Sequence, residues 1–151
     1  GSSYRIFVKK NYSHFKEDKS VNYFRKIEKK ANLENKKTYD KFNKQIISHK
    51  NKLVKIIKEL NRKNKKVFGL GASTKGNVIL NYCKFTKNEI KFLVDRNTLK
   101  DGCKAIGSNI PIISEEKARK LKPDYYLLLP YFFINEISNR EKKFFNEGGK
   151  M

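Results

Sequence analysis

From residue 65 onward, short apolar runs alternate with amphipathic segments, and this alternation restricts the fold more than any other feature. The apolar runs are residues 65–73, 90–97, 109–114 and 123–132. Helical periodicity marks residues 74–85, 115–121 and 134–149, with Ser114 as an N-cap and Gly148-Gly149 as the last helix end. This order predicts a parallel sheet with right-handed crossovers, and the near-continuous apolar runs indicate strands covered on both faces. We therefore expect an open parallel α/β sheet with helices on both faces, whose final strand, after Gly149, is truncated.

The first 64 residues have a different pattern, which predicts a strand followed by a helical extension. Residues 4–10 alternate as a strand does, and residues 20–33 predict a short helix with Ser20 as its N-cap. Residues 35–64 predict one long helix with an apolar seam at heptad spacing. The seam consists of Tyr39, Phe42, Ile46, His49, Leu53, Ile56 and Leu60. It would suit the chain's own core equally well as another domain or a second copy in a homodimer.

The chain carries a formal net charge of +21, most of it in the first half. Such an excess favours anionic partners. Its 30 lysines outnumber its 6 arginines, whereas readers of nucleic acid rely on arginine for bidentate contacts, so we do not expect a specific nucleic-acid site. No apolar run approaches the ~20 residues of a membrane span. Cys83 and Cys103 form no C-x-x-C pair and are not spaced as zinc ligands are. This favours free thiols and a cytoplasmic location.

The stretch VFGLGASTKGNVILNYC places a glycine turn between a predicted strand and a predicted helix. Such a turn directs backbone N–H groups and the positive end of the helix at one point, which suits a phosphate. We expect Gly71, Ala72, Ser73, Lys75 and Gly76 to bind it through backbone amides and charge. The spacing is not that of a Walker loop, because Asn77 stands where Lys is required, and the dinucleotide fingerprint lacks its third glycine.

A second charged group follows the next predicted strand, in VDRNTLKDG. Ligands of open parallel sheets bind at this carboxyl edge, and an acidic residue at the end of the second strand can bind a ribose diol. We expect Asn77, Asp95 and Arg96 to contact the ribose, base or sugar of a nucleotide ligand, and Arg96 could also meet a diphosphate together with Lys75. Lys100 belongs to the same expected substrate site. His14 and His49 have no partners at ligand spacing, so the sequence predicts no metal site and no catalytic residue of its own.

The motifs GLGASTKGNVILNYC, VDRNTLKDG, NIPIIS and PDYYLLLPYF occur in an order and spacing that resemble the C-terminal domain of S-adenosylmethionine-dependent sugar C-methyltransferases. The resemblance is strong from residue 66 to 151. It extends to the long helix and to the first residues, where Gly1-Ser2-Ser3 is either native to the family's first strand or an expression tag.

The resemblance implies a three-part enzyme acting on nucleoside-diphosphate keto-deoxysugars of the dTDP type. Its parts would be a zinc-binding N-terminal domain, a central methyltransferase domain and this Rossmann-like end domain. A central methyltransferase domain, outside this sequence, would hold S-adenosylmethionine and the base that removes the substrate proton. Residues 1–64 would bridge to that domain, and residues 65–151 would form a Rossmann-like domain that binds the nucleotide-sugar. This fragment would bind no cofactor and would transfer no methyl group alone.

Two departures from the family pattern concern residues that we expect at ligand edges. Tyr131-Phe132 stands where the family commonly has Trp-Asn, and Ile106-Gly107 stands where it often has Pro-Gly. They leave open which sugar, carbon and nucleoside are used, and whether the site still binds. The alternatives are a regulatory or redox domain that binds NAD or coenzyme A, and a basic module that binds nucleic acid or an acidic partner.

Overall fold

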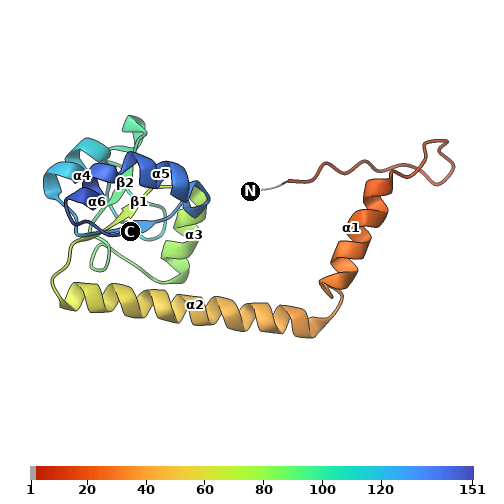
Figure 1. The fold of residues 1–151 in the computed structure, drawn as a ribbon, viewed down its shortest axis with the longest axis horizontal. Helices are drawn as coiled ribbons and strands as arrows, with labels where there is room; N and C mark the ends of the chain where they lie inside the picture. Colours follow the sequence, from red (N-terminus) through yellow and green to blue (C-terminus); the bar gives the residue numbers. More distant parts are fainter. Residues whose placement is uncertain (1–2) are drawn as a thin grey trace. The chain divides into compact units, whose positions relative to one another are not determined.

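The computed structural model describes residues 3–151. The chain divides into two compact units, and the boundary between them falls between Ser48 and His49. The first unit contains α1 (Lys19–Lys30) and the beginning of α2 (Lys36–Arg62), which is one unbroken helix (Figure 1). Asp18, not Ser20, caps α1, because its carboxylate accepts a hydrogen bond from the Ser20 N–H at 2.8 Å. A negative charge at this position also suits the helix dipole.

The segment from Tyr4 to Lys10 is not a strand, contrary to the sequence prediction. Its side chains are exposed, and no neighbouring strand among residues 3–151 offers it backbone partners. Alternation alone does not make a strand, since extended backbone needs a ladder for its N–H and C=O groups. Gly1 and Ser2, on which part of the family resemblance rests, lie outside the described residues.

The second unit contains a four-stranded parallel sheet in the order β3-β2-β1-β4. The strands are β1 (Val67–Leu70), β2 (Leu93–Asp95), β3 (Ile112–Ser114) and β4 (Tyr125–Leu128). β1 is central, with Gly69 opposite Leu93 on one side and Leu127 on the other. The predicted α/β class is therefore confirmed. Beyond β4, Lys150 forms a single parallel bridge with Tyr125.

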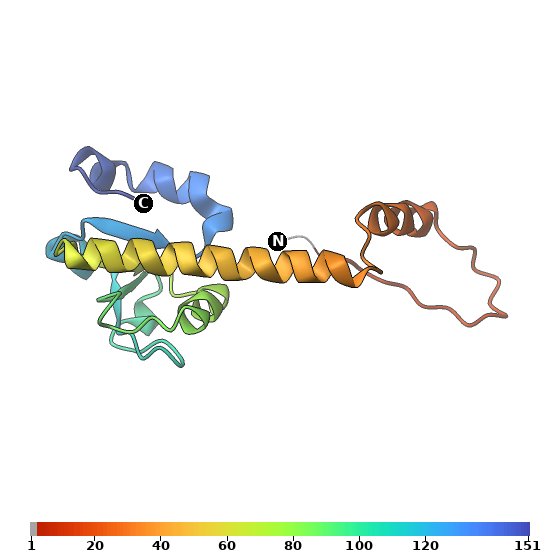
Figure 2. The same ribbon diagram turned by 90° about the horizontal axis from the view of Figure 1, so that it is seen from below.

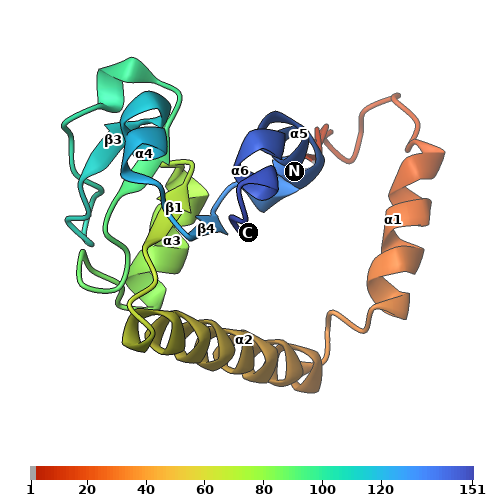
Figure 3. The same cartoon turned by 60° about the vertical axis from the view of Figure 1, so that its left-hand side comes forward.

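Helices cover both faces of the sheet, and each strand divides its side chains between two apolar clusters. Val67, Leu93 and Leu129 pack on one face with Ile57 of α2 and Leu80 of α3 (Thr74–Tyr82). The other face packs on α4 (Glu115–Leu121), α5 (Ile134–Arg140) and α6 (Lys142–Asn146). Figure 2 shows α3 and the α5–α6 pair on opposite sides of the sheet, and Figure 3 shows α4 beside β3.

The predicted helix at residues 134–149 is divided into α5 and α6 at Glu141. Glu141 is buried and its carboxylate lies 3.3 Å from Arg140 and 3.5 Å from Arg119. This break allows Phe144 to pack on the ring of Tyr126. Ser114 caps α4, and Gly148, at a φ of +90°, ends α6, as the sequence predicts.

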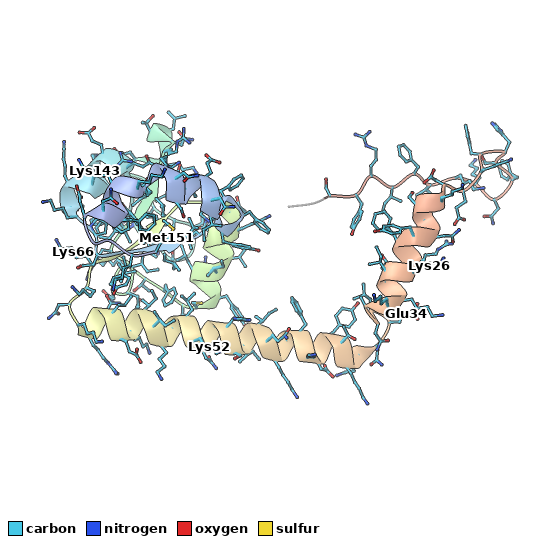
Figure 4. The ribbon with its side chains drawn as sticks, viewed as in Figure 1. Lys26, Glu34, Lys52, Lys66, Lys143 and Met151 are labelled. Carbon is cyan, nitrogen blue, oxygen red and sulfur yellow. The ribbon has the colours of Figure 1, made fainter. Side chains whose placement is uncertain are left out.

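The seam of α2 behaves differently along its length. Leu53 and Leu60 pack on the sheet, and between them Ile57 is buried while the predicted Ile56 is exposed. In a straight helix of 3.6 residues per turn, positions 56 and 57 lie equally far from the line through 53 and 60, on opposite sides of it. Val54 also packs on the core, which places the buried face on the side of Ile57. Tyr39, Phe42 and Ile46 are exposed. Figure 4 shows side chains such as that of Lys52 projecting from α2.

The sequence places the end of the helical extension after residue 64, whereas the two compact units meet within α2. The last turns of the helix therefore belong to the α/β unit. Among residues 3–151, no helix is both long and apolar enough to cross a membrane.

Candidate anion-binding crevice

A cavity of about 240 Å³ opens at the carboxyl ends of β1, β2 and β4. After β1 the chain builds β2 and β3 on one side and then crosses to β4 on the other. Loops diverge where the strand order reverses in this way, and ligands of open α/β sheets bind there. Gly71, Asp95 and Arg96 line one wall, and Pro130 and α5 line the other.

The glycines of the loop are required by its packing. Gly71 has a φ of +88°, and a Cβ there would lie 2.6 Å from Cδ of Pro130. A Cβ on Gly76 would lie 2.8 Å from Cβ of Leu129. Both glycines therefore bring the loop and α3 close to the end of β4, which gives this wall of the crevice its shape.

The first turn of α3 presents unpaired donors. Ser73 caps the helix, and its Oγ accepts the Gly76 N–H at 3.0 Å. The Gly71 N–H is held by Val94 and the Ala72 N–H by Asp95. Within residues 3–151 the N–H groups of Thr74 and Lys75 have no recorded partner, as is normal for the first turn of a helix. These two donors and the helix dipole make this point attractive to an anion.

Asp95 and Lys100 form an internal clamp on the glycine loop. One carboxylate oxygen of Asp95 accepts the Ala72 N–H and the Lys100 ammonium, each at 2.9 Å. The other oxygen accepts the Asn97 N–H at 2.9 Å. Lys100 also donates to the Ala72 carbonyl at 2.9 Å. Asp95 and Lys100, both predicted to contact a ligand, thus bind each other, and together they hold the glycine loop through Ala72.

Of the remaining predicted residues, Lys75 and Asn77 lie in α3, and Arg96 directly follows β2. The Lys75 ammonium sits 4.7 Å from the ring centroid of Phe132, at the start of the segment after β4. Arg96 lies 4.0 Å from Glu136 with both side chains largely exposed, so solvent weakens that pair. Asn77 is half-buried; its N–H donates to the Ser73 carbonyl, and its own carbonyl accepts from Asn81.

Sequence reasoning missed the far wall of the crevice, which comes from α4 and α5. Arg140 lines the cavity and pairs with Glu115 at 2.9 Å. Burial, with the Glu141 carboxylate nearby, raises the pKa of Tyr126 to about 12. Arg96 and Glu115 also line a second hollow of about 500 Å³, beside α4. The sequence does contain charged residues directly after the strand ends and in the last helix, which could have suggested this wall. Only the topology of the sheet shows that these residues lie next to one another.

The two family departures lie at different edges of the sheet. Tyr131 and Phe132, in the short turn η2 (Tyr131–Phe133), follow β4 at the carboxyl edge. The Ile106 carbonyl accepts a hydrogen bond from Asn81 at 3.0 Å, close to the C-terminal end of α3. Since α3 runs back from the carboxyl edge, Ile106 lies at the amino edge. Ile106 therefore lies away from the crevice at the carboxyl edge, and its expected contact with the ligand stays a prediction.

These features define a Rossmann-type α/β domain with a crevice at the switch point of its sheet. The profile of the family described as the C-methyltransferase C-terminal domain matches residues 1–151, and the chain belongs to that family. It is also similar to the C-methyltransferase NovU of Streptomyces niveus, at 45% identity over 86 residues. That match covers 57% of this chain and 20% of NovU, so it spans about a fifth of the relative's length.

Proposed function

We propose that this domain binds the diphosphate of a nucleoside-diphosphate keto-deoxysugar, of the dTDP type, for a C-methyltransferase. The observation that carries the proposal is the position of the unpaired Thr74 and Lys75 N–H groups and the Lys75 ammonium at the start of α3. They follow closely after Gly71, which lines a crevice at the switch point together with Arg96. A diphosphate offers oxygens to all of them, and charge-assisted hydrogen bonds contribute about 1.5–3 kcal/mol each. Asn77 lies one residue past this turn and is proposed to contact the ribose or sugar.

In this proposal Gly71, Ala72, Ser73 and Gly76 shape the anion site, and Asp95 and Lys100 hold it. The three hydrogen bonds on the Asp95 carboxylate leave it poorly placed to bind a ribose diol. This argues against the adenosine part of S-adenosylmethionine or of NAD as the ligand of the crevice. We place the methyl donor, the proton-abstracting base and the methyl transfer in the part of the enzyme outside this chain, which alone would be inactive.

The domain's contribution to the reaction would be proximity. Fixing the diphosphate at one point restricts where the attached sugar lies, and this lowers the entropy cost of bringing its reactive carbon to the methyl donor. The exposed side chains of Tyr39, Phe42 and Ile46 are proposed to pack on the methyltransferase domain of the same enzyme. We place the enzyme in the cytoplasm, consistent with its free thiols.

Calorimetric titration of the chain with dTDP, UDP, GDP and NADH at moderate salt tests the proposal. We expect one nucleoside diphosphate to bind, and Lys75→Ala to weaken that binding by about 1–3 kcal/mol. Lys87→Ala is the matched control, because Lys87 is an exposed lysine that follows the C-terminal end of α3 in the sequence. Saturable binding of NADH alone would favour the cofactor-domain alternative. If Lys75→Ala and Lys87→Ala lost the same affinity, the effect of Lys75 would come from the overall positive charge and not from a contact with the ligand.

A further inference from the structure

The segment after β4 exposes aromatic rings beside the crevice, and one of them holds a cation. Tyr131 and Phe132 are each about half exposed, with ring centroids 4.2 Å apart and planes tilted by 30°. The Lys75 ammonium approaches the Phe132 ring to 4.7 Å from its centroid. Phe132 therefore has a neighbouring ring and a cation within contact distance.

Lys75 occupies a position where a cation is disfavoured. It is the second residue of α3, and the N-terminus of a helix repels positive charge. A lysine side chain also has four flexible carbons and would otherwise turn away into solvent. The negative face of an aromatic ring attracts an ammonium at this distance. The ring of Phe132 thus offsets the repulsion and restricts where the ammonium can lie.

We propose that Phe132 is a positioning residue that holds the Lys75 ammonium beside the first turn of α3, ready for a diphosphate. This inference rests on the proposed function. An ammonium has three donors, so contact with one ring leaves others for phosphate oxygens. Because the side chain is ordered before the ligand arrives, less conformational entropy is lost on binding. Phe132 would affect affinity without touching the ligand.

The first measurement is the NMR spectrum of the Lys75 ε-methylene group in the 151-residue chain, assigned by comparison with Lys75→Arg. Above the face of a ring, these protons are expected to shift upfield. The shift should disappear in Phe132→Leu and persist in Phe132→Tyr. Tyr82→Leu is the matched control, since it removes another pair of the same kind, in which Lys50 lies 4.6 Å from the Tyr82 ring centroid. It should leave the Lys75 signal unchanged.

The second measurement is the affinity for dTDP. An exposed cation–π contact corresponds to about a two- to fivefold effect, so Phe132→Leu should weaken binding by that factor. Phe132→Tyr should bind like the wild type. In the Lys75→Ala background, Phe132→Leu should cause no further loss, because the two residues act together.

The outcomes separate the two proposals. Wild-type binding that is unchanged in Phe132→Leu, or an equal loss in the Lys75→Ala background, would overturn the positioning role alone. A wild-type ε-methylene signal without an upfield shift would also overturn it. A wild type that binds no nucleoside diphosphate would overturn the proposed function and, with it, this inference.

Discussion

At the scale of single residues, Asp95 shows how a side chain that resembles a ligand contact can serve the loop instead. Its side chain is only 15% exposed and accepts from Ala72, Asn97 and Lys100. A carboxylate at the end of the second strand is the feature that suggests a ribose contact, and the sequence has no means of showing that two backbone amides already occupy it. Only the fold brings Ala72 and Asp95 together.

Replacing this carboxylate should loosen the loop. Asp95→Asn keeps the size but loses the charge and puts an NH₂ group where an oxygen now accepts, so we expect the free energy of unfolding to fall by about 1–3 kcal/mol. Urea denaturation measures the change. Glu116→Gln provides the control, since it disrupts an exposed pair with Lys120 and should cost less than about 1 kcal/mol. Equal stability of Asp95→Asn and wild type would show that the clamp contributes little.

At the scale of elements, α2 is one helix with two environments. Ile57 is 3% exposed within the apolar cluster that includes α3, whereas Ile46, three turns earlier, is 36% exposed. Ile46 lies on the predicted seam and Ile57 lies beside it, yet only Ile57 is buried, since only the last turns of the helix lie on the sheet. Within one helix, Ile57 is thus part of the core, whereas Ile46 lies on a surface that nothing in the described residues covers.

Ile57→Ala should lower the free energy of unfolding of the α/β unit by about 2–5 kcal/mol, as expected for a buried large-to-small change. Ile46→Ala should stay within about 0.5–1 kcal/mol of the wild type, because it leaves no cavity in the described core. Thermal or urea unfolding of both variants compares them directly. A large loss for Ile46→Ala would mean that the first half of α2 is buried in solution, for example against a second copy of the chain.

The elements of the α/β unit could be predicted because their signals are local. Apolar runs, the cap at Ser114 and the closing Gly148 each act within a few residues. The errors arose where distant partners decide the structure. Within residues 3–151 the segment at residues 4–10 has no neighbouring strand, and the break at Glu141 depends on Arg119, twenty-two residues earlier. The far wall of the crevice was missed for the same reason.

At the scale of the whole molecule, the apolar side chains on both faces of the sheet are covered by helices. Those of the helical extension are exposed. Phe24 and Ile27 of α1 are exposed, as are Tyr39 and Phe42 of α2. Large apolar side chains gathered on a lysine-rich surface mark an interaction site more often than a free surface. The family to which the chain belongs, and the small share of NovU that it matches, make the rest of the enzyme the partner that we propose.

Changing Tyr39, Phe42 and Ile46 together to serine tests this proposal. In the isolated chain the α/β unit should unfold as the wild type does, because these side chains lie outside its core. In the full-length enzyme, the same changes should expose the extension to limited proteolysis and slow methyl transfer, while dTDP binding by the isolated chain stays unchanged. Loss of a dimer of the isolated chain, measured by sedimentation, would assign the surface to a second copy instead. Unchanged proteolysis and turnover in the full-length enzyme would contradict the bridging role, because an interface that has lost three large apolar side chains cannot keep its full hydrophobic stabilisation.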